Sequence, residues 1–236
     1  MAPPAALFLS PHPDDLVYSA FAEIANRRKK RTAVIVFNTS RFTKWGLLPK
    51  NLVTLTRTAE EKIILGSLGV RTSFLWMEDS SARTTVVNMK NLASSLDRFR
   101  GDQLDLFCPL GLTEHPDHVA VRDLAVNYWL KCGRRPQLCF YEDLPYAARI
   151  DTVDREVRDC INRLSLVCPR ISICYRPMTA ELFRKKLIFS RLYLTQNDHT
   201  KLLEKHGRGL GERCGSPYAE KYVCTPVGDI QQEELL

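Results

Sequence analysis

The sequence contains no long hydrophobic run, although apolar residues make up 44% of it. No stretch approaches the roughly 18 to 20 consecutive apolar residues that a membrane-spanning helix needs. The first residues also lack the basic start and the long apolar core of a signal peptide. We therefore expect no membrane span, and we expect a cytoplasmic protein.

Linkers rich in glycine or serine, internal repeats and low-complexity tracts are also absent from the 236 residues. This argues against a repeat architecture, and a chain of this length can bury the core of one α/β domain. We predict a single domain over residues 1–236. Its core should extend from about residue 5 to 224, with a C-terminal tail over 225–236.

The eight cysteines include no CxxC pair, the spacing typical of zinc ribbons and redox motifs. Isolated cysteines in a chain of this length are most often buried thiols that behave as small hydrophobic residues. We therefore predict that most of the cysteines are buried structural thiols, and that none of them binds metal or takes part in catalysis.

The formal net charge is +7, and much of the excess lies in a run of basic residues at 27–31. We place this run at the C-terminal end of the first helix, where cations complement the helix dipole. No recognised nucleic-acid-binding module accompanies the charge, so we expect no nucleic-acid partner.

Short β-branched or aromatic runs alternate with longer segments of helical period through the first half of the chain. The predicted strands cover 5–9, 32–38, 72–76, 104–109 and 137–142, and the predicted helices cover 16–30, 55–68, 86–100 and 117–131. This alternation predicts an α/β fold with a Rossmann-like, doubly wound and mostly parallel sheet flanked by helices.

Two local patterns refine this prediction. In the helix at 55–68, Ile63, Ile64 and Leu68 fall on one face, and Gly69 follows as a C-terminal glycine would. After Asp143 the order changes. A helix near 153–164, a strand at 171–175 and a helix at 179–194 follow without a linker, so we expect them to complete the same domain.

Three of the five histidines lie in two polar clusters that share the tripeptide His-Pro-Asp. The clusters are Pro11-His12-Pro13-Asp14-Asp15 and Glu114-His115-Pro116-Asp117-His118. Each cluster follows a predicted strand, and ligands of open parallel sheets bind at the carboxyl ends of the strands. We therefore expect the two clusters to meet at one edge of the sheet.

Imidazole and carboxylate ligands with one open position are the usual arrangement of a hydrolytic zinc site. The clusters offer more such groups than a metal needs, and a hydrolase requires that surplus as a proton acceptor and an oxyanion donor. One cluster alone would favour helix caps and structural hydrogen bonds. Two clusters of the same form, each at a strand-to-helix junction, favour a metal site.

At these residues the sequence resembles the PIG-L/LmbE family of N-acetylglucosaminyl deacetylases, whose motifs read approximately AHPDDE and HPDH. Weaker similarity in the same order lies at 56–60, 68–70, 141–142, 186–196 and 219–220. The resemblance covers 7 to about 222, so the single domain would be a PIG-L/LmbE-like deacetylase domain.

The resemblance implies a zinc-dependent N-deacetylase that acts on a small-molecule N-acylated amino sugar. His12, Asp15 and His118 would be the ligands of Zn²⁺, with Fe²⁺ as an alternative ion. Asp14 would be the general base that activates water and later protonates the departing amine.

The resemblance implies three further roles. His115, as an imidazolium, would help to stabilise the tetrahedral oxyanion, and Asp117 would orient a histidine from behind. Arg57 would bind a hydroxyl or an anionic group of the substrate.

The sequence departs from the family pattern around the first cluster. Leu16 replaces a glutamate, the segment 17–20 replaces a glycine-rich helix start, and Pro11 replaces an alanine. These changes alter the floor of the expected pocket and leave the substrate open. Two alternatives therefore stand beside the deacetylase: a catalytically idle sugar-binding or regulatory protein, and a metal hydrolase acting on another amide or ester.

Several residues outside the clusters carry weaker predictions. We expect His199 and His206 to be solvated, and Trp45 either to pack on its own domain or to stack on a sugar. Glu114 is read as a gate or a turn residue, and the segment 150–170 as a pocket rim or an external helix. The sequence leaves the oligomeric state open, with a homo-oligomer among the alternatives.

Overall fold

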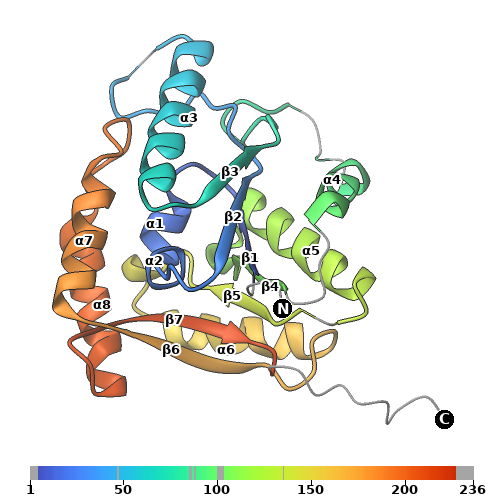
Figure 1. Ribbon diagram of the computed structural model, residues 1–236, viewed down its shortest axis with the longest axis vertical. Coiled ribbons are helices and arrows are strands. Elements are labelled where there is room, and N and C mark those ends of the chain that lie inside the picture. The colour runs from blue at the N-terminus through green and yellow to red at the C-terminus, as the bar shows by residue number, and fades with distance from the viewer. Residues whose placement is uncertain are drawn as a thin grey trace.

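The computed structural model describes residues 5–46, 48–84, 87, 89–99, 104–134 and 136–226. A seven-stranded sheet with the order β3-β2-β1-β4-β5-β7-β6 forms its centre (Figure 1). The strands are β1 (Ala5–Ser10), β2 (Lys30–Ile35), β3 (Arg71–Phe74), β4 (Leu104–Pro109), β5 (Leu138–Tyr141), β6 (Ser172–Met178) and β7 (Tyr218–Cys224).

The strands from β3 to β5 run parallel, and only β7 pairs antiparallel, with β5 on one side and β6 on the other. The chain order reverses between β1 and β4, which is the switch point of a doubly wound sheet. β1 is apolar and almost wholly buried because helices cover both faces of the sheet. The predicted α/β fold with a mostly parallel sheet is therefore confirmed.

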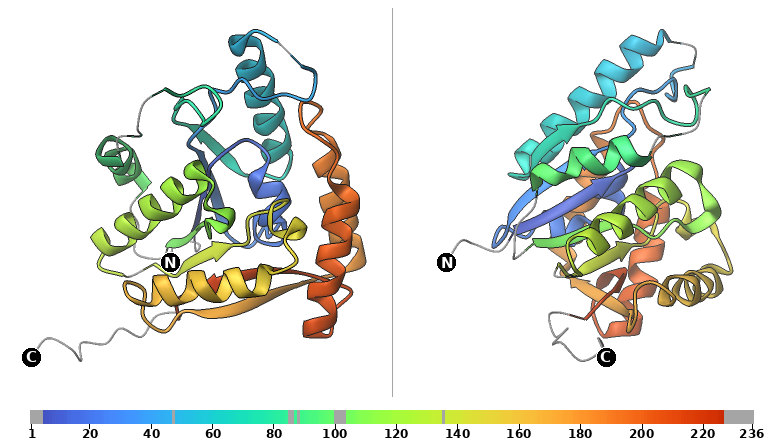
Figure 2. Two further views of the ribbon diagram at one scale, coloured as in Figure 1. Left: turned by 180° about the vertical axis from the view of Figure 1, so that it is seen from behind. Right: turned by 90° about the vertical axis from the view of Figure 1, so that its right-hand side faces the viewer.

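Helices α4, α5 and α6 cover one face of the sheet, and α1, α2, α3, α7 and α8 lie on the other (Figures 1 and 2). Their bounds are α1 (Asp15–Ser19), α2 (Phe21–Ile24), α3 (Lys50–Ser67), α4 (Met89–Leu96), α5 (Pro116–Lys131), α6 (Val153–Ser165), α7 (Ala180–Arg191) and α8 (Thr200–Cys214). Short 3-10 helices are η1 (Asp97–Phe99), η2 (Leu112–Glu114) and η3 (Ala147–Arg149). In the part of the chain described, no helix is both long and apolar enough to cross a bilayer.

The single helix predicted over 16–30 is wrong, because α1 and α2 are separate at Ala20 and end by Ile24. The side chain of Glu220 on β7 accepts the backbone N–H groups of Phe21 and Ala22, each at 2.9 Å, in place of the preceding helical carbonyls. The basic run does not cap a helix, because Lys30 already begins β2 and pairs with Ala5.

The predicted helix at 55–68 exists as α3 but begins at Lys50. Its assigned apolar face is wrong in one position, since Ile63 is 70% exposed while Ile64 and Leu68 are buried. Gly69 follows with φ +76°, as predicted for a glycine beyond a helix end. The predicted helix at 86–100 corresponds to α4 and η1, and its positions 86, 88 and 100 lie outside the described residues.

The elements after Asp143 join the same sheet, as predicted, but two of them were not foreseen. α8 and β7 occupy 200–214 and 218–224, where the sequence pattern predicted neither a helix nor a strand. On β7, Cys224 lies directly opposite Cys139 of β5 and forms a disulfide with it. Six other cysteines are free thiols, as predicted for most of them, and this pair is the exception.

Candidate metal centre and active site

The two His-Pro-Asp clusters meet at the carboxyl edge of the sheet because β1 and β4 are neighbouring parallel strands. The ring centroids of His12 and His118 are 5.3 Å apart. His115 is equally close to His12, with a centroid distance of 5.4 Å. The predicted convergence of the clusters is therefore confirmed.

His12, Asp15 and His118 form a group that could hold a metal ion, with one ligand atom from each within 4.8 Å of the others. Oδ2 of Asp15 lies 3.3 Å from Nδ1 of His12 and 3.6 Å from Nε2 of His118. That Nε2 is buried and has no hydrogen-bond partner among the described residues. Buried polar nitrogens are normally paired, and this donor set suits zinc or ferrous iron, so the residues fit a divalent ion.

The carboxylate of Asp117 lies against the ring of His12. Its Oδ2 lies 2.9 Å from Nε2 of His12 and also accepts the Ser80 N–H at 2.8 Å, while Arg83 pairs with Oδ1 at 2.7 Å. Burial by itself raises the pKa of Asp117, but the hydrogen bond from His12 holds that pKa well below its usual range. His12, His115 and Asp117 also lie close enough for a metal, yet these contacts already occupy Asp117.

Asp143 holds the other histidine, and the sequence reasoning did not assign it. Its Oδ1 lies 2.6 Å from Nδ1 of His118, and its Oδ2 accepts the backbone N–H of Leu112 at 2.8 Å. Because Nδ1–H of His118 donates to this carboxylate, Nε2 of His118 keeps its lone pair for a metal. The position of Asp143 in the sequence could have identified it, because it follows the end of β5, the parallel strand beside β4.

Asp14 has φ +98°, a left-handed conformation that is strained for a residue with a side chain. Its backbone N–H donates to Oε2 of Glu61 at 3.2 Å, and the hydroxyl of Tyr193 donates to the same oxygen. Burial raises the pKa of Asp14 well above its usual range, and the charge of Arg57, 3.9 Å away, opposes that rise. A raised pKa suits a carboxylate that exchanges protons near neutral pH.

His115 lies beside the candidate ligands and lines the same cavity. The backbone N–H of Asp117 donates to its Nδ1 at 3.3 Å, so the ring proton belongs on Nε2. Burial and the neighbouring charges of His118 and His12 lower the pKa of His115 to about 4. The expected imidazolium is therefore not favoured, although a neutral Nε2–H still donates a hydrogen bond.

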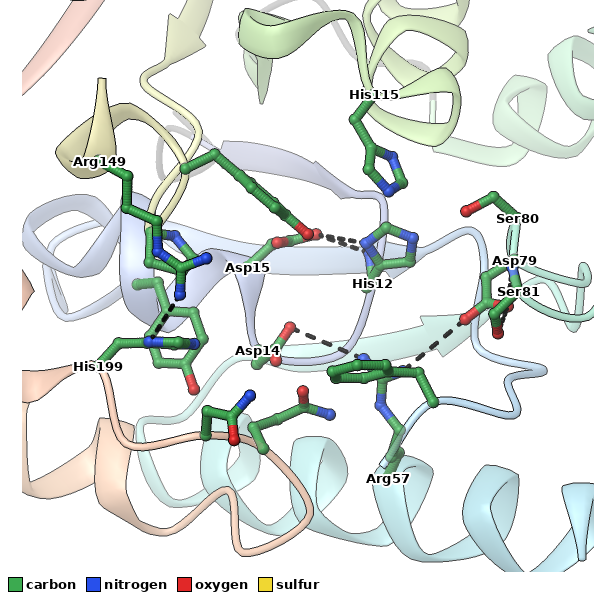
Figure 3. A pocket seen from close by; sticks show the side chains of 16 residues that line it. His12, Asp14, Asp15, Arg57, Asp79, Ser80, Ser81, His115, Arg149 and His199 are labelled. Atoms are coloured by element: carbon green, nitrogen blue, oxygen red, sulfur yellow. Dashed lines mark hydrogen bonds and ion pairs between the residues drawn. The ribbon is translucent and has the colours of Figure 1, made fainter. Parts of the chain in front are cut away.

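Arg57 is buried beneath Asp14 rather than extended into the cavity. Its guanidinium donates to Oγ of Ser40 at 2.9 Å and to the Pro13 carbonyl at 3.2 Å. Asp79, a site residue that the sequence reasoning missed, lies 3.9 Å away on the side opposite Asp14 (Figure 3). Arg57 thus borders the cavity with its charge shared between two carboxylates.

A cavity of about 470 Å³ opens over this group, a size that suits a small ligand. Its lining residues are His12, Asp14, Asp15, Tyr18, Phe42, Arg57, Asp79, Ser80, Ser81, His115, Pro145, Tyr146, Arg149, Gln196, Asn197 and His199. Trp45 is 49% exposed and is not among them. Residues 150–170 do not line the cavity either, so α6 is an external helix.

The two remaining histidines are not simply solvated, so that prediction is wrong. His199 lines the cavity, where Nη2 of Arg149 donates to its Nδ1 at 3.3 Å. His206 lies on α8 with its Nε2 2.6 Å from Oε2 of Glu142. Glu114 is an exposed turn residue with φ +54°.

The fold and the site together define an α/β protein with a candidate divalent-metal centre at the switch point of its sheet. The chain belongs to the family described as GlcNAc-PI de-N-acetylase (PIG-L), whose pattern matches residues 7–129. No curated protein matches the chain in sequence.

Solved structures resemble the whole chain at low identity. A teicoplanin deacetylase in a zinc-inhibited form is 20% identical with a TM-score of 0.73, covering 96% of this chain and 100% of its own. The N,N'-diacetylchitobiose deacetylase of Pyrococcus horikoshii is 18% identical with a TM-score of 0.68, covering 94% and 84%. The 4-carboxy-2-hydroxymuconate hydratase of Pseudomonas putida KT2440 is 17% identical with a TM-score of 0.68, covering 99% and 100%. At this identity the likeness shows a shared fold.

Proposed function

We propose that this protein is a metal-dependent N-deacetylase that hydrolyses an N-acyl group, first of all N-acetyl, on an amino sugar or a small molecule containing one. One observation carries the proposal: His12, Asp15 and His118 form a metal-binding group, and Asp14 lies beside it in the same cavity. Membership of the PIG-L family supports the reaction, and two of the similar structures are described as deacetylases.

We propose Zn²⁺ as the ion, with Fe²⁺ as the alternative, held by His12, Asp15 and His118. When bound, such an ion supplies Lewis-acid activation of the amide carbonyl and of water. The side chains of Asp117 and Asp143 fix the ring orientations of the two histidine ligands.

The chain's own residues supply the proton transfers and the orientation. Asp14 takes a proton from the attacking water as oxygen bonds to the acyl carbon, then gives that proton to the departing nitrogen, so that an amine and a carboxylic acid result. Nε2–H of His115 donates to the developing oxyanion. Arg57 contacts a hydroxyl or an anionic group of the substrate only at the edge of its guanidinium that borders the cavity, because Asp14 and Asp79 already share its charge. General acid–base catalysis of this kind contributes about 10²- to 10⁴-fold in rate.

Two alternatives remain in view. Leu16, at the departure from the family motif, is buried beneath the cluster and favours a catalytically idle sugar-binding protein. A metal hydrolase acting on another amide or ester would use the same groups. The intact set of His12, Asp14, Asp15 and His118 favours the deacetylase over the idle protein.

Metal analysis of the purified protein followed by acetate-release assays tests the proposal. The panel would contain N-acetylglucosamine, N,N'-diacetylchitobiose, an N-acetylated amino acid and an acetate ester, each with zinc, ferrous iron or no added metal. We expect acetate from the sugars, and loss of turnover in Asp14→Ala with the metal retained. Asp123→Ala, which removes an exposed carboxylate far from the cavity, is the matched control.

Each alternative predicts a different result. A metal-bound protein that releases no acetate from any compound would support the idle protein, and release only from the non-sugar compounds would support the other hydrolase. Turnover that survives in Asp14→Ala would mean that the base is assigned wrongly. A cytoplasmic location and a homo-oligomer stay predictions. The Cys139–Cys224 disulfide argues against the first of these, because disulfides are rare in reducing compartments.

A further inference from the structure

The cavity has a second polar wall, formed by η3 and by the chain that leads into α8. Arg149 ends η3, and His199 immediately precedes α8. The two side chains lie together on the side of the cavity away from Asp79, Ser80 and Ser81 (Figure 3). Nη2 of Arg149 donates to Nδ1 of His199 at 3.3 Å.

Arg149 is an exposed residue whose side chain lines the cavity. Among the described residues, no carboxylate lies within ion-pair distance of its guanidinium. By contrast, Arg57 on the other side of the cavity lies 3.9 Å from both Asp14 and Asp79. An unpaired guanidinium at a cavity wall is suited to a charged ligand group.

His199 adds a donor to the same wall. Because its Nδ1 accepts from Arg149, its proton belongs on Nε2. Burial and the charge of Arg149 lower the pKa of His199, so the ring is neutral at neutral pH. The adjacent Asp198 does not occupy the wall, since its Oδ1 accepts the backbone N–H and the hydroxyl of Thr200 at 2.9 and 2.6 Å.

Tyr18 on α1 adds a hydroxyl to the cavity wall that Arg149 and His199 line. Its side chain lines the cavity and is 2% exposed, and its ring centroid lies 5.9 Å from that of His199. Its hydroxyl has no hydrogen-bond partner among the described residues. Burial raises the pKa of Tyr18, which keeps the hydroxyl protonated. A buried unpartnered hydroxyl carries a free-energy cost that a ligand group can remove.

We propose that Arg149, His199 and Tyr18 form a subsite for an anionic group, a phosphate or a carboxylate, carried by the amino-sugar substrate. One unpaired cation and two neutral donors from three separate elements match the charge and the acceptor oxygens of such a group. The inference deepens the proposed deacetylase, on which it rests for the identity of the sugar. It narrows the substrate from amino sugars in general to anionic ones.

Isothermal titration calorimetry on the full-length protein tests the subsite without requiring turnover. The probes are glucosamine, glucosamine 1-phosphate, glucosamine 6-phosphate and muramic acid, which separate phosphate at two positions from carboxylate. We expect at least one anionic sugar to bind about tenfold or more tightly than glucosamine. The ratio of the two Kd values is the readout.

Substitutions then locate the preference. Arg149→Ala should bring that ratio close to one, and Arg149→Lys should keep part of it. Tyr18→Phe, which removes only the hydroxyl, should lower the ratio about threefold to tenfold. Arg155→Ala removes the same charge from an exposed position of α6 outside the cavity and should leave the ratio unchanged.

Two results would overturn the subsite: equal affinities for glucosamine and every anionic probe, or an unchanged ratio in Arg149→Ala. An unchanged ratio in Arg149→Ala is also the result expected if the phosphate binds at the metal group and not at Arg149. Selective binding together with no acetate release from any N-acetyl sugar would overturn the proposed function alone. Acetate release with no anionic preference would overturn the subsite alone.

Discussion

Asp143 and His118 form a buried pair in which Oδ1 of the carboxylate lies 2.6 Å from Nδ1 of the imidazole. The pair joins the end of β5 to α5, the helix that follows β4. It fixes which ring nitrogen of His118 faces Asp15, and so it decides the geometry of the candidate metal centre.

Replacing Asp143 should therefore weaken metal binding. We expect Asp143→Ala to lower the affinity for zinc by about 10- to 100-fold, because His118 loses the partner that sets its tautomer and orientation. Competition with a chromophoric chelator measures the affinity. Asp123→Ala is the control, because Asp123 is exposed and its ion pair is with the neighbouring Arg122. An unchanged affinity in Asp143→Ala would show that the pair does not support the site.

Metal removal should lower stability. A ligand present at about 100 times its Kd stabilises the folded state by about 2.7 kcal/mol, so chelation should lower the denaturant midpoint, and re-addition should restore it. Equilibrium unfolding with and without chelator measures the change. His118→Ala removes a proposed ligand, so its midpoint should respond little to the chelator. A wild-type midpoint that ignores the chelator would contradict a metal at this group.

Glu142 should make stability depend on pH. It is 3% exposed and lies 2.6 Å from Nε2 of His206 and 2.7 Å from Nζ of Lys221. Burial alone raises the pKa of Glu142, but the hydrogen bond from His206 and the charge of Lys221 hold it below its usual 4.5. The ionised Glu142 therefore stabilises the folded protein above pH 4.5. This contribution is lost as the pH falls from 4.5 through the lower pKa that Glu142 has in the folded state.

We therefore expect Glu142→Gln to cost about 1.5 to 3 kcal/mol at pH 7, because Lys221 loses its buried charged partner and keeps the contact with Asp154 at 3.0 Å. The difference from wild type should shrink as the pH falls below 4.5, where the unfolded carboxylate also protonates. Thermal unfolding followed by circular dichroism from pH 7 to pH 3 measures it. Glu212→Gln, an exposed position on α8, should match wild type throughout. A constant difference across this range would contradict the assignment.

Two glycines of α8 should respond oppositely to alanine. A Cβ on Gly209 would meet no atom within 4 Å, so Gly209→Ala should stabilise the helix by about 0.5 to 1 kcal/mol. A Cβ on Gly211 would lie 2.5 Å from the Ser216 carbonyl oxygen and 2.7 Å from the Tyr218 backbone. Gly211→Ala should therefore cost about 1 to 3 kcal/mol. Urea unfolding of both variants measures this, and equal effects would mean that the packing of α8 on β7 is misplaced.

Local pattern was enough to predict the parallel strands in the first half of the molecule, although it merged α1 and α2 into one helix. Apolar runs identified the parallel strands, and the two His-Pro-Asp clusters could be placed at one edge because parallel strands end there together. This reasoning predicted a metal site at the two clusters, and the family resemblance singled out His12, Asp15 and His118 as its ligands. A cluster of functional residues that directly follows a strand can be placed from the sequence, because the strand fixes the position of the residues that come next to it.

The C-terminal part could not be read in this way. α8 contains three glycines among charged residues, which hid the apolar positions Leu203 and Leu210 that it buries. The terminal Gly215, with φ +70°, was the signal that could have marked its end. The strand β7 was missed with it, and so the disulfide across β5 and β7 was missed as well.

The fold class, the place of the two clusters along the chain and the chemistry that they offer can all be inferred from the residues alone. The contact of Asp143 with His118, and the cavity wall shared by Arg149, His199 and Tyr18, are visible only in the folded protein. These partners come from elements far apart in the chain. The packing of the whole sheet with its helices decides which side chains these elements bring together. Local sequence periodicity gives no information about that packing.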